Sequence, residues 1–163
     1  MKLIFLFFFI PFFLNAGFSQ TEIPHQFVST NYSNGNLNTE KWIVDNNEDS
    51  YNKYYYENGN LKKQGWLKNN LKEDYWKFYY ENGNLKSEGK FYKNVKFDWW
   101  IDYNKQGEKR REGRYEKGKK EGYCKVYKND ILRIEGNFRN NIKNGHWKFY
   151  NEDGSIKNII EYD

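Results

Sequence analysis

Aromatic and polar residues alternate along short runs of this chain. In Trp76-Lys77-Phe78-Tyr79, Trp and Phe point to one side of an extended strand and Lys and Tyr to the other, because successive strand residues face opposite sides. Residues 147–150 repeat the same order of residue types. No stretch shows a sustained 3.6-residue period, so the pattern predicts β-strands and no helices.

These runs recur with a period of 23–24 residues, and four kinds of marker keep the same phase. A period of this length is typical of repeat architectures. The markers are Asn-Gly motifs at 33–37, 57–61 and 81–85, with weaker copies at 105–107 and 152–154 and a shortened one at Asp130; Gly65, Gly89, Gly113 and Gly136; Trp76, Trp100, Cys124 and Trp147; and Tyr55, Tyr79, Tyr103, Tyr127 and Tyr150.

Two turns divide each repeat into strands. Asn-Gly between aromatic runs is a strong hairpin signal, and we expect a type I′ turn with positive φ at both residues. A second turn lies midway, where residues that tolerate a left-handed backbone recur: Asn70, Asn94, Gly118 and Asn141, then Asp74, Asp98, Gly122 and Gly145. The sequence predicts an all-β fold, an elongated meander of about five tandem β-hairpin repeats of 23–24 residues in a single open antiparallel sheet of about ten strands.

Strand alternation sorts the markers onto two faces. We call the face with Trp76, Trp100, Cys124 and Trp147 the Trp face, where each periodic Gly leaves room for a ring to lie across the neighbouring strand. The opposite side, the Tyr face, carries the candidate binding residues, and packing of the rings along Lys stems is the alternative interpretation. They are Tyr55, Tyr79, Tyr103, Tyr127, Tyr150, Lys77, Lys125 and Lys148.

The two ends depart from the repeat. Lys41 replaces the periodic Gly in the first repeat, and Ile159 and Ile160 take the Glu-Gly positions in the last strand. We interpret both ends as caps. The alternative is that the final strand is an open edge awaiting a partner.

The repeat resembles that of a known family. Residues 79–94, which read YYENGNLKSEGKFYKN, are similar to the MORN-2 repeat, and residues 113–123 resemble its second half. The resemblance covers residues 33–163, with departures at Lys41, Asp130, Cys124 and residues 95–98. It implies a β-hairpin repeat sheet without catalytic activity. It also links the chain to bacterial YwqK-type antitoxins and to MORN proteins described as membrane-associated or protein-binding scaffolds.

The chain begins with a candidate leader. Lys2 precedes an apolar run over residues 3–14, and small residues follow at Gly17 and Ser19. We expect a signal peptide at 1–19, an N-terminal extension at 20–34 and a MORN-2-like domain at 35–163. The run is short for a membrane span, so we expect no transmembrane anchor after cleavage and a periplasmic or secreted protein; a retained anchor is the alternative.

Charge and chemistry narrow the choice of function. The formal net charge is +5, and residues 107–130 hold nine basic and five acidic groups, which favours a mixed-charge surface over nucleic-acid binding. The two histidines and the single cysteine form no catalytic or metal-ligand pattern. We therefore expect no enzyme activity and no cofactor or metal.

Two classes of function remain. The first is an exported module that binds another protein through a sheet face or its terminal edge strand, in the manner of an antitoxin that neutralises its partner. The alternative is a carbohydrate or cell-wall binding module whose exposed aromatic rows stack on sugar rings. The partner is accordingly expected to be a protein or a cell-wall glycan.

Overall fold

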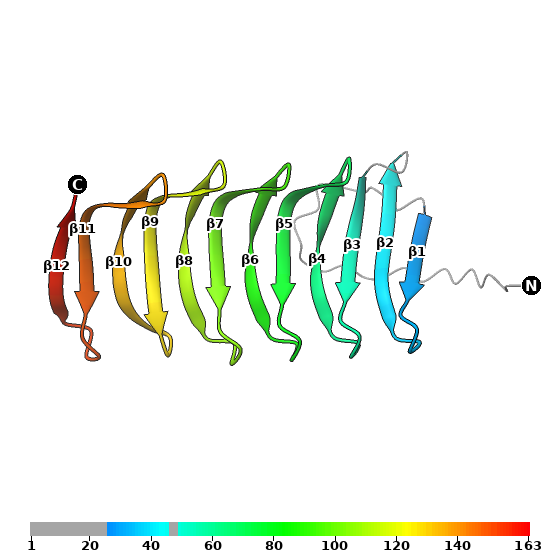
Figure 1. Cartoon of the computed structure of the whole chain (residues 1–163), viewed down its shortest axis with the longest axis horizontal. Helices are drawn as coiled ribbons and strands as arrows, with labels where there is room; N and C mark the ends of the chain where they lie inside the picture. Colours follow the sequence, from blue (N-terminus) through cyan, green and yellow to red (C-terminus); the bar gives the residue numbers. More distant parts are fainter. Residues whose placement is uncertain (1–25, 46–48) are drawn as a thin grey trace, which may run out of the picture.

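The computed structural model of the chain describes residues 26–45 and 49–163. Within them, antiparallel strands form one open twelve-stranded sheet whose order follows the chain from β1 to β12 (Figure 1). No helix occurs in the residues so described. The strands are β1 (Gln26–Asn31), β2 (Leu37–Asp45), β3 (Asp49–Tyr55), β4 (Leu61–Lys68), β5 (Leu71–Tyr79), β6 (Leu85–Tyr92), β7 (Val95–Tyr103), β8 (Lys109–Glu116), β9 (Lys119–Lys128), β10 (Ile131–Arg139), β11 (Ile142–Tyr150) and β12 (Ile156–Tyr162).

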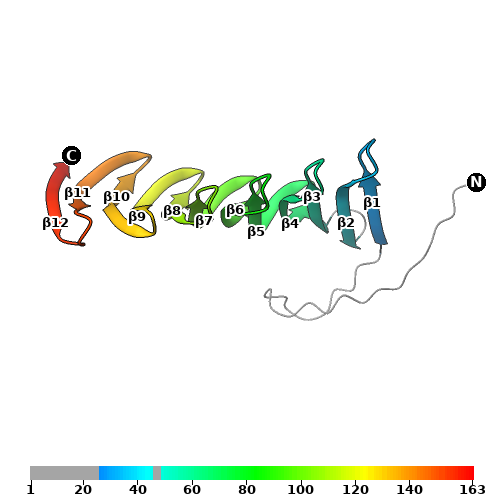
Figure 2. The same ribbon diagram turned by 90° about the horizontal axis from the view of Figure 1, so that it is seen from below.

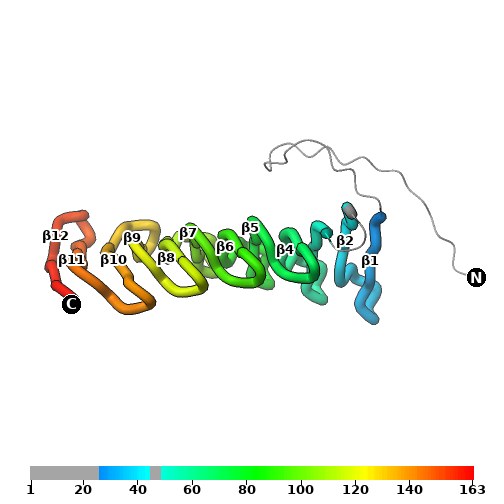
Figure 3. The backbone as a smooth tube through the Cα atoms, turned by 90° about the horizontal axis from the view of Figure 1, so that it is seen from above, coloured from blue at the N-terminus to red at the C-terminus, as the bar shows by residue number. Residues whose placement is uncertain are grey.

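The predicted all-β hairpin meander is confirmed, but the sheet has twelve strands instead of about ten. The predicted domain, residues 35–163, holds eleven of these strands, and the twelfth is β1, inside the predicted extension, which pairs antiparallel with β2. The predicted signal peptide lies outside the described residues. Figures 2 and 3 show that the strands are bowed and that the hairpins succeed one another along the long axis without crossing.

The Asn-Gly turns are not of type I′. In the third copy the Gly83 N–H donates to the Tyr80 carbonyl at 2.9 Å, and the Tyr80 N–H donates to the Asn84 carbonyl at 2.8 Å. Gly83 has φ 90°, whereas Asn82 is not left-handed. This is a three-residue loop, a type I turn closed by a left-handed Gly. Where the motif is one residue shorter, Asn129 and Asp130 both have positive φ, as a two-residue type I′ turn requires.

Asparagine has a second role in these turns. The Nδ2 groups of Asn82 and Asn84 both donate to the carbonyl of Lys105 in the next Asn-Gly turn, at 2.8 Å. In the preceding Asn-Gly turn, the Nδ2 groups of Asn58 and Asn60 donate in the same way to the carbonyl of Glu81. Asparagine amides therefore connect successive hairpins along one rim of the sheet.

The midway turns follow the prediction. Asn70, Asn94, Gly118 and Asn141 have φ between 60° and 79°, and Asp74, Asp98, Gly122 and Gly145 have φ between 56° and 75°. In all four of these midway turns the residue before the first set is also left-handed (Asn69, Lys93, Lys117 and Asn140), which makes them type I′ turns like the one at Asn129 and Asp130. The second left-handed position, four residues after the first set, lies next to a register shift in the strand.

The core consists of indole rings lying over glycines on the Trp face. Trp76 is fully buried and Trp100 is 2% exposed, and they pack around Phe91. A Cβ atom added to Gly89 would lie 2.5 Å from the indole of Trp100, so only glycine permits this close approach. The same relation joins Gly65 to Trp76 and Gly136 to Trp147. This arrangement confirms the predicted role of the periodic glycine.

Each core indole is also anchored by polar contacts. The Trp100 Nε1–H donates to the Lys90 carbonyl at 3.0 Å, and equivalent bonds hold Trp76 and Trp147. The Lys96 ammonium lies 3.8 Å from the centre of the Trp100 ring, a cation–π contact, and Lys143 covers Trp147 in the same way. A buried indole N–H needs such an acceptor, so these bonds make the ring position specific.

Candidate functional site: the Tyr face and the hollow opposite

The predicted tyrosine row lies on one face of the sheet, near the end of every second strand. Its hydroxyls bond to residues on the preceding strand pair: Tyr103 donates to Glu88 at 2.8 Å, Tyr127 to Glu112 at 2.5 Å and Tyr150 to Glu135 at 2.6 Å. Tyr55 donates to Glu40, and Tyr79 accepts from the Gln64 side chain. These hydroxyls join one hairpin to the next.

The three predicted lysines converge on the same carboxylates. Lys77 lies 3.9 Å from Glu88, Lys125 3.9 Å from Glu112 and Lys148 3.6 Å from Glu135. The eight candidate residues therefore lie together, as predicted. Their polar atoms are engaged within the sheet and the tyrosines are half-buried, while the lysine side chains stay 35–45% exposed. Their role in binding stays a prediction.

Two carboxyl groups of this face, those of Glu112 and Glu135, have lowered pKa values. Partial burial alone would raise the pKa of Glu112, but hydrogen bonds from Tyr127 and Lys109 and the charges of Lys109 and Lys125 outweigh it, and the pKa is lowered. The pKa of Glu135 is lowered for the same kind of reason, with Tyr123, Tyr150 and Lys148 as partners. The tyrosine ladder thus depends on charged acceptors.

Acid should weaken the sheet through these glutamates. A carboxyl group whose pKa is lower folded than unfolded adds stability above its unfolded pKa of about 4.3, and that stability is lost as pH falls through the folded pKa. We expect the free energy of unfolding, measured by urea titration, to fall below about pH 5. Glu112→Gln should flatten this acid limb. The control Glu116→Gln removes a charge from an exposed position and should leave the limb unchanged; a Glu112→Gln profile identical to the wild-type profile would contradict the account.

Several exposed rings on the Tyr face near the middle of the sheet were not among the predicted residues. We define the aromatic patch as Tyr75, Tyr92, Phe97, Trp99 and Tyr123, which are 36–56% exposed. Tyr75, Trp99 and Tyr123 each precede a Trp-face marker, so they share its period. That position could have been found in the sequence.

Cross-strand register places the aromatic patch around basic residues at the centre of the sheet. Lys90 on β6 is directly opposite Tyr75 on β5 and Phe97 on β7. Arg114 on β8 is opposite Trp99. Lys90 has Asp98 at 3.7 Å as an ion-pair partner, while Arg114 is exposed and forms no salt bridge with any residue the structure describes. The aromatic patch is therefore interspersed with basic residues, with Lys90 between Tyr75 and Phe97 and Arg114 beside Trp99.

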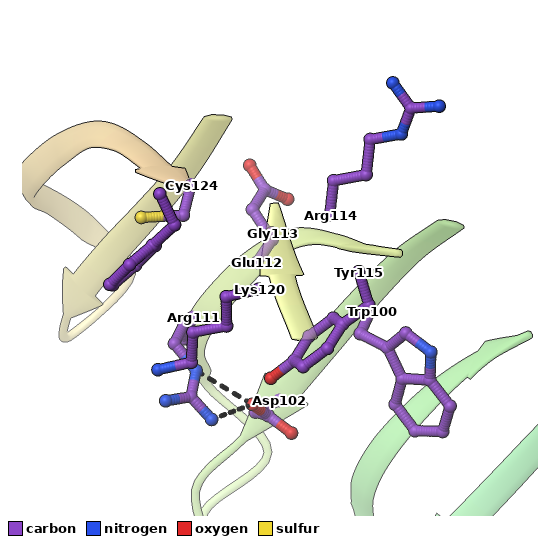
Figure 4. A pocket seen from close by; sticks show the side chains of 10 residues that line it. Trp100, Asp102, Arg111, Glu112, Gly113, Arg114, Tyr115, Lys120 and Cys124 are labelled. Carbon is purple, nitrogen blue, oxygen red and sulfur yellow. Dashed lines mark hydrogen bonds and ion pairs between the residues drawn. The ribbon is translucent and has the colours of Figure 1, made fainter. Parts of the chain in front are cut away.

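On the Trp face, Cys124 stands where the other repeats place an indole. The small side chain leaves a hollow above Gly113, and Figure 4 shows Cys124 on one side of it and Trp100 on the other, with Arg111, Lys120 and Tyr115 between them. The Arg111 guanidinium is held by Asp102 through two hydrogen bonds, at 3.0 and 2.5 Å. Lys120 occupies the same repeat position as the lysines that cover the neighbouring indoles.

The residues around the hollow occupy the positions that surround a buried indole in the other repeats, but they offer little reactive chemistry. Burial raises the pKa of the Cys124 thiol, although nearby Lys120 and Arg111 oppose the shift. A neutral thiol is a poor nucleophile and a poor metal ligand. Across residues 26–45 and 49–163, no three His, Cys, Asp or Glu side chains are placed to hold a metal ion.

Filling the hollow should stabilise the protein. Cys124→Trp restores the repeat consensus, with Gly113 beneath the ring and Lys120 able to cover it. We expect the free energy of unfolding to rise by about 1–2 kcal/mol, the usual gain from filling a cavity, as measured by urea denaturation. Cys124→Ser, which fills nothing, should give no gain. A destabilised Cys124→Trp protein would show that the hollow is not shaped for an indole.

The paired turns, the indole-on-glycine core and the tyrosine ladder define a β-hairpin repeat scaffold. Three segments of the chain match the family model described as MORN repeat variant: residues 50–69, 75–94 and 143–163. They correspond to the hairpins β3–β4, β5–β6 and β11–β12. Residues 95–142 lie outside the matches but keep the strand period.

A comparison with curated proteins finds no significant match. None of the described residues forms a helix long and apolar enough to cross a membrane.

Proposed function

We propose that this chain is a non-catalytic, exported repeat scaffold that binds a partner protein through the aromatic patch. The supporting observation is that five large rings lie exposed on the Tyr face over β5–β9, whereas the indoles of the same repeats on the Trp face are buried. Contiguous exposed rings are typical of interaction surfaces, and Trp and Tyr contribute most of the binding energy in protein interfaces.

The surroundings of the aromatic patch indicate the chemistry of the partner. Arg114 beside Trp99 forms no salt bridge within the described sheet, and residues 107–130 carry the excess of positive charge. A partner surface that combines apolar groups with acidic ones complements this arrangement. The tyrosine–glutamate ladder lies beside the aromatic patch on the same face, and its hydrogen bonds join the strands that present the patch.

The proposed role includes export and neutralisation of the partner. Export is supported by the candidate signal peptide, which implies a partner in the cell envelope or outside the cell. An antitoxin-like action is supported by the family resemblance. Binding alone is sufficient for that action, because an inhibitor that covers a toxin's surface needs no chemistry of its own.

Capture with matched variants tests this function. Residues 20–163, which hold all twelve strands, are immobilised and exposed to native envelope extract, with purified cell wall tested in parallel and mass spectrometry as the readout. We expect one stoichiometric protein, lost with the variant Tyr75→Ser/Phe97→Ser/Trp99→Ser and retained with the control Ile131→Ser/Ile142→Ser, which removes exposed apolar side chains elsewhere. Equal capture by both variants would refute the patch. Retention on wall material, competed by soluble sugar, would favour the carbohydrate alternative.

A further inference from the structure

The sheet ends in two free edges that complement each other. Among the strands of the described residues, β1 is the first and β12 the last in sheet order, so each has a described neighbour on one side only. All six residues of β1 are exposed, including Phe27 and Val28. On β12, Ile156, Ile159 and Ile160 are 38–53% exposed. Neither strand contains proline, one of the devices that protect natural edges, and β1 carries no charge.

The two edge strands carry different positions of the repeat: β1 carries the Trp position and β12 the Gly position. At every internal junction between an even and the next odd strand, the position of the periodic Gly lies next to the position of the periodic Trp, as in the pairing of Gly89 with Trp100. Register assigns Val28 to the Trp position, because it pairs with Lys41 in the Gly position. Ile160 occupies the Gly position of β12, opposite Trp147.

The unpaired side of β12 is therefore the side on which an internal even strand pairs with an odd strand, and β1 is an odd strand. The side chains at the Gly position of β12 and at the Trp position of β1 are also complementary in size. Inside the sheet a bulky indole lies over a glycine, and even one added Cβ would clash with it. At the free edges the glycine is replaced by Ile160 and the indole by Val28, two branched side chains that can lie beside each other. The same register sets Ile159 opposite Ser29.

We propose that the chain associates with itself head to tail, β12 of one copy pairing antiparallel with β1 of the next, with Ile160 facing Val28. This junction repeats the internal even-to-odd pairing and extends the sheet across copies. Because the two surfaces are different, the contact is heterologous and leaves a free edge at each end, so copies add in series. The inference concerns the sheet edges and is separate from the aromatic patch.

Sedimentation velocity with purified residues 20–163 over a range of concentrations tests the junction. We expect a concentration-dependent series of oligomers. The variant Val28→Lys/Ile160→Lys places two lysines opposite each other at every junction and should weaken association by about tenfold relative to Val28→Glu/Ile160→Lys, where the facing charges attract. Circular dichroism and thermal unfolding confirm that both variants stay folded.

Comparing the two charge variants distinguishes head-to-tail pairing of β12 with β1 from pairing of β12 with β12. Both variants carry Ile160→Lys, so association of β12 with β12 would respond equally to the two and would overturn the proposal. A wild-type protein that stays monomeric at every concentration would also overturn it. The variant Tyr75→Ser/Phe97→Ser/Trp99→Ser should assemble like wild type, so failure of the proposed partner binding and failure of the head-to-tail contact give different results.

Discussion

Replacing Trp100 with alanine should lower the free energy of unfolding by about 4 kcal/mol, a typical cost of removing a buried Trp. The ring is 2% exposed and lies edge-on to Phe91, with ring centres 4.9 Å apart. Its loss also leaves the Lys90 carbonyl without the indole donor and Lys96 without the closer of its two cation–π partners. Total stability of a domain is about 5–15 kcal/mol, so this single change should remove a large part of it.

The neighbouring Trp99 provides a matched control. Trp99→Ala removes the same side chain one residue earlier, but that ring is 46% exposed on the Tyr face. We expect a clearly smaller loss, of about 1–2 kcal/mol, because nearly half of the Trp99 ring is already in contact with solvent. Guanidinium denaturation of both variants measures the difference. Equal losses would contradict the assignment of the core to the Trp face.

Replacing Gly89 with alanine should cost about 3 kcal/mol, at the upper end of the usual range for overpacking. The added Cβ would lie 2.5 Å from the Trp100 indole, and the ring cannot move away because Lys90 and Phe91 hold it on two sides. The expected result is a lower denaturation midpoint with the indole forced out of its buried position, which fluorescence of the tryptophans reports.

Gly113→Ala is the matched control for this effect. Gly113 has the same repeat position, but its neighbour is Cys124, and the nearest atom to an added Cβ is the Cys124 Cβ at 2.9 Å. Without a ring to displace, the cost should be clearly smaller than at Gly89. If the two variants lose equal stability, the glycines are needed for some reason other than the indoles.

Much of the architecture could be predicted from the sequence because each repeat restates it. The spacing of Gly89 and Trp100 recurs in the next repeats, and strand alternation then fixes which residues share a face. The left-handed positions at Asn94 and Asp98 also followed from residue type. A single copy of the motif would have supported none of this.

Other features depend on contacts that a repeat pattern does not specify. Asn-Gly fits two turn types, and the three-residue loop with its left-handed Gly83 became visible only in the backbone geometry. Alternation assigns a residue to a face but does not show which rings remain exposed on it. For that reason the row of Tyr103 was predicted as the site, whereas Trp99 is the more exposed ring.

The measurement that most directly tests the account is the affinity of the captured partner for variants of the two faces. Surface plasmon resonance would compare wild type, the variant Tyr75→Ser/Phe97→Ser/Trp99→Ser, and the Trp-face variant Cys124→Ser. The patch variant loses three aromatic residues, and two of them at about 2 kcal/mol each are enough to weaken the affinity by about 1,000-fold. Cys124→Ser should bind like wild type. Unchanged affinity of a folded patch variant would contradict the claim that this scaffold binds its partner through the exposed rings of the Tyr face.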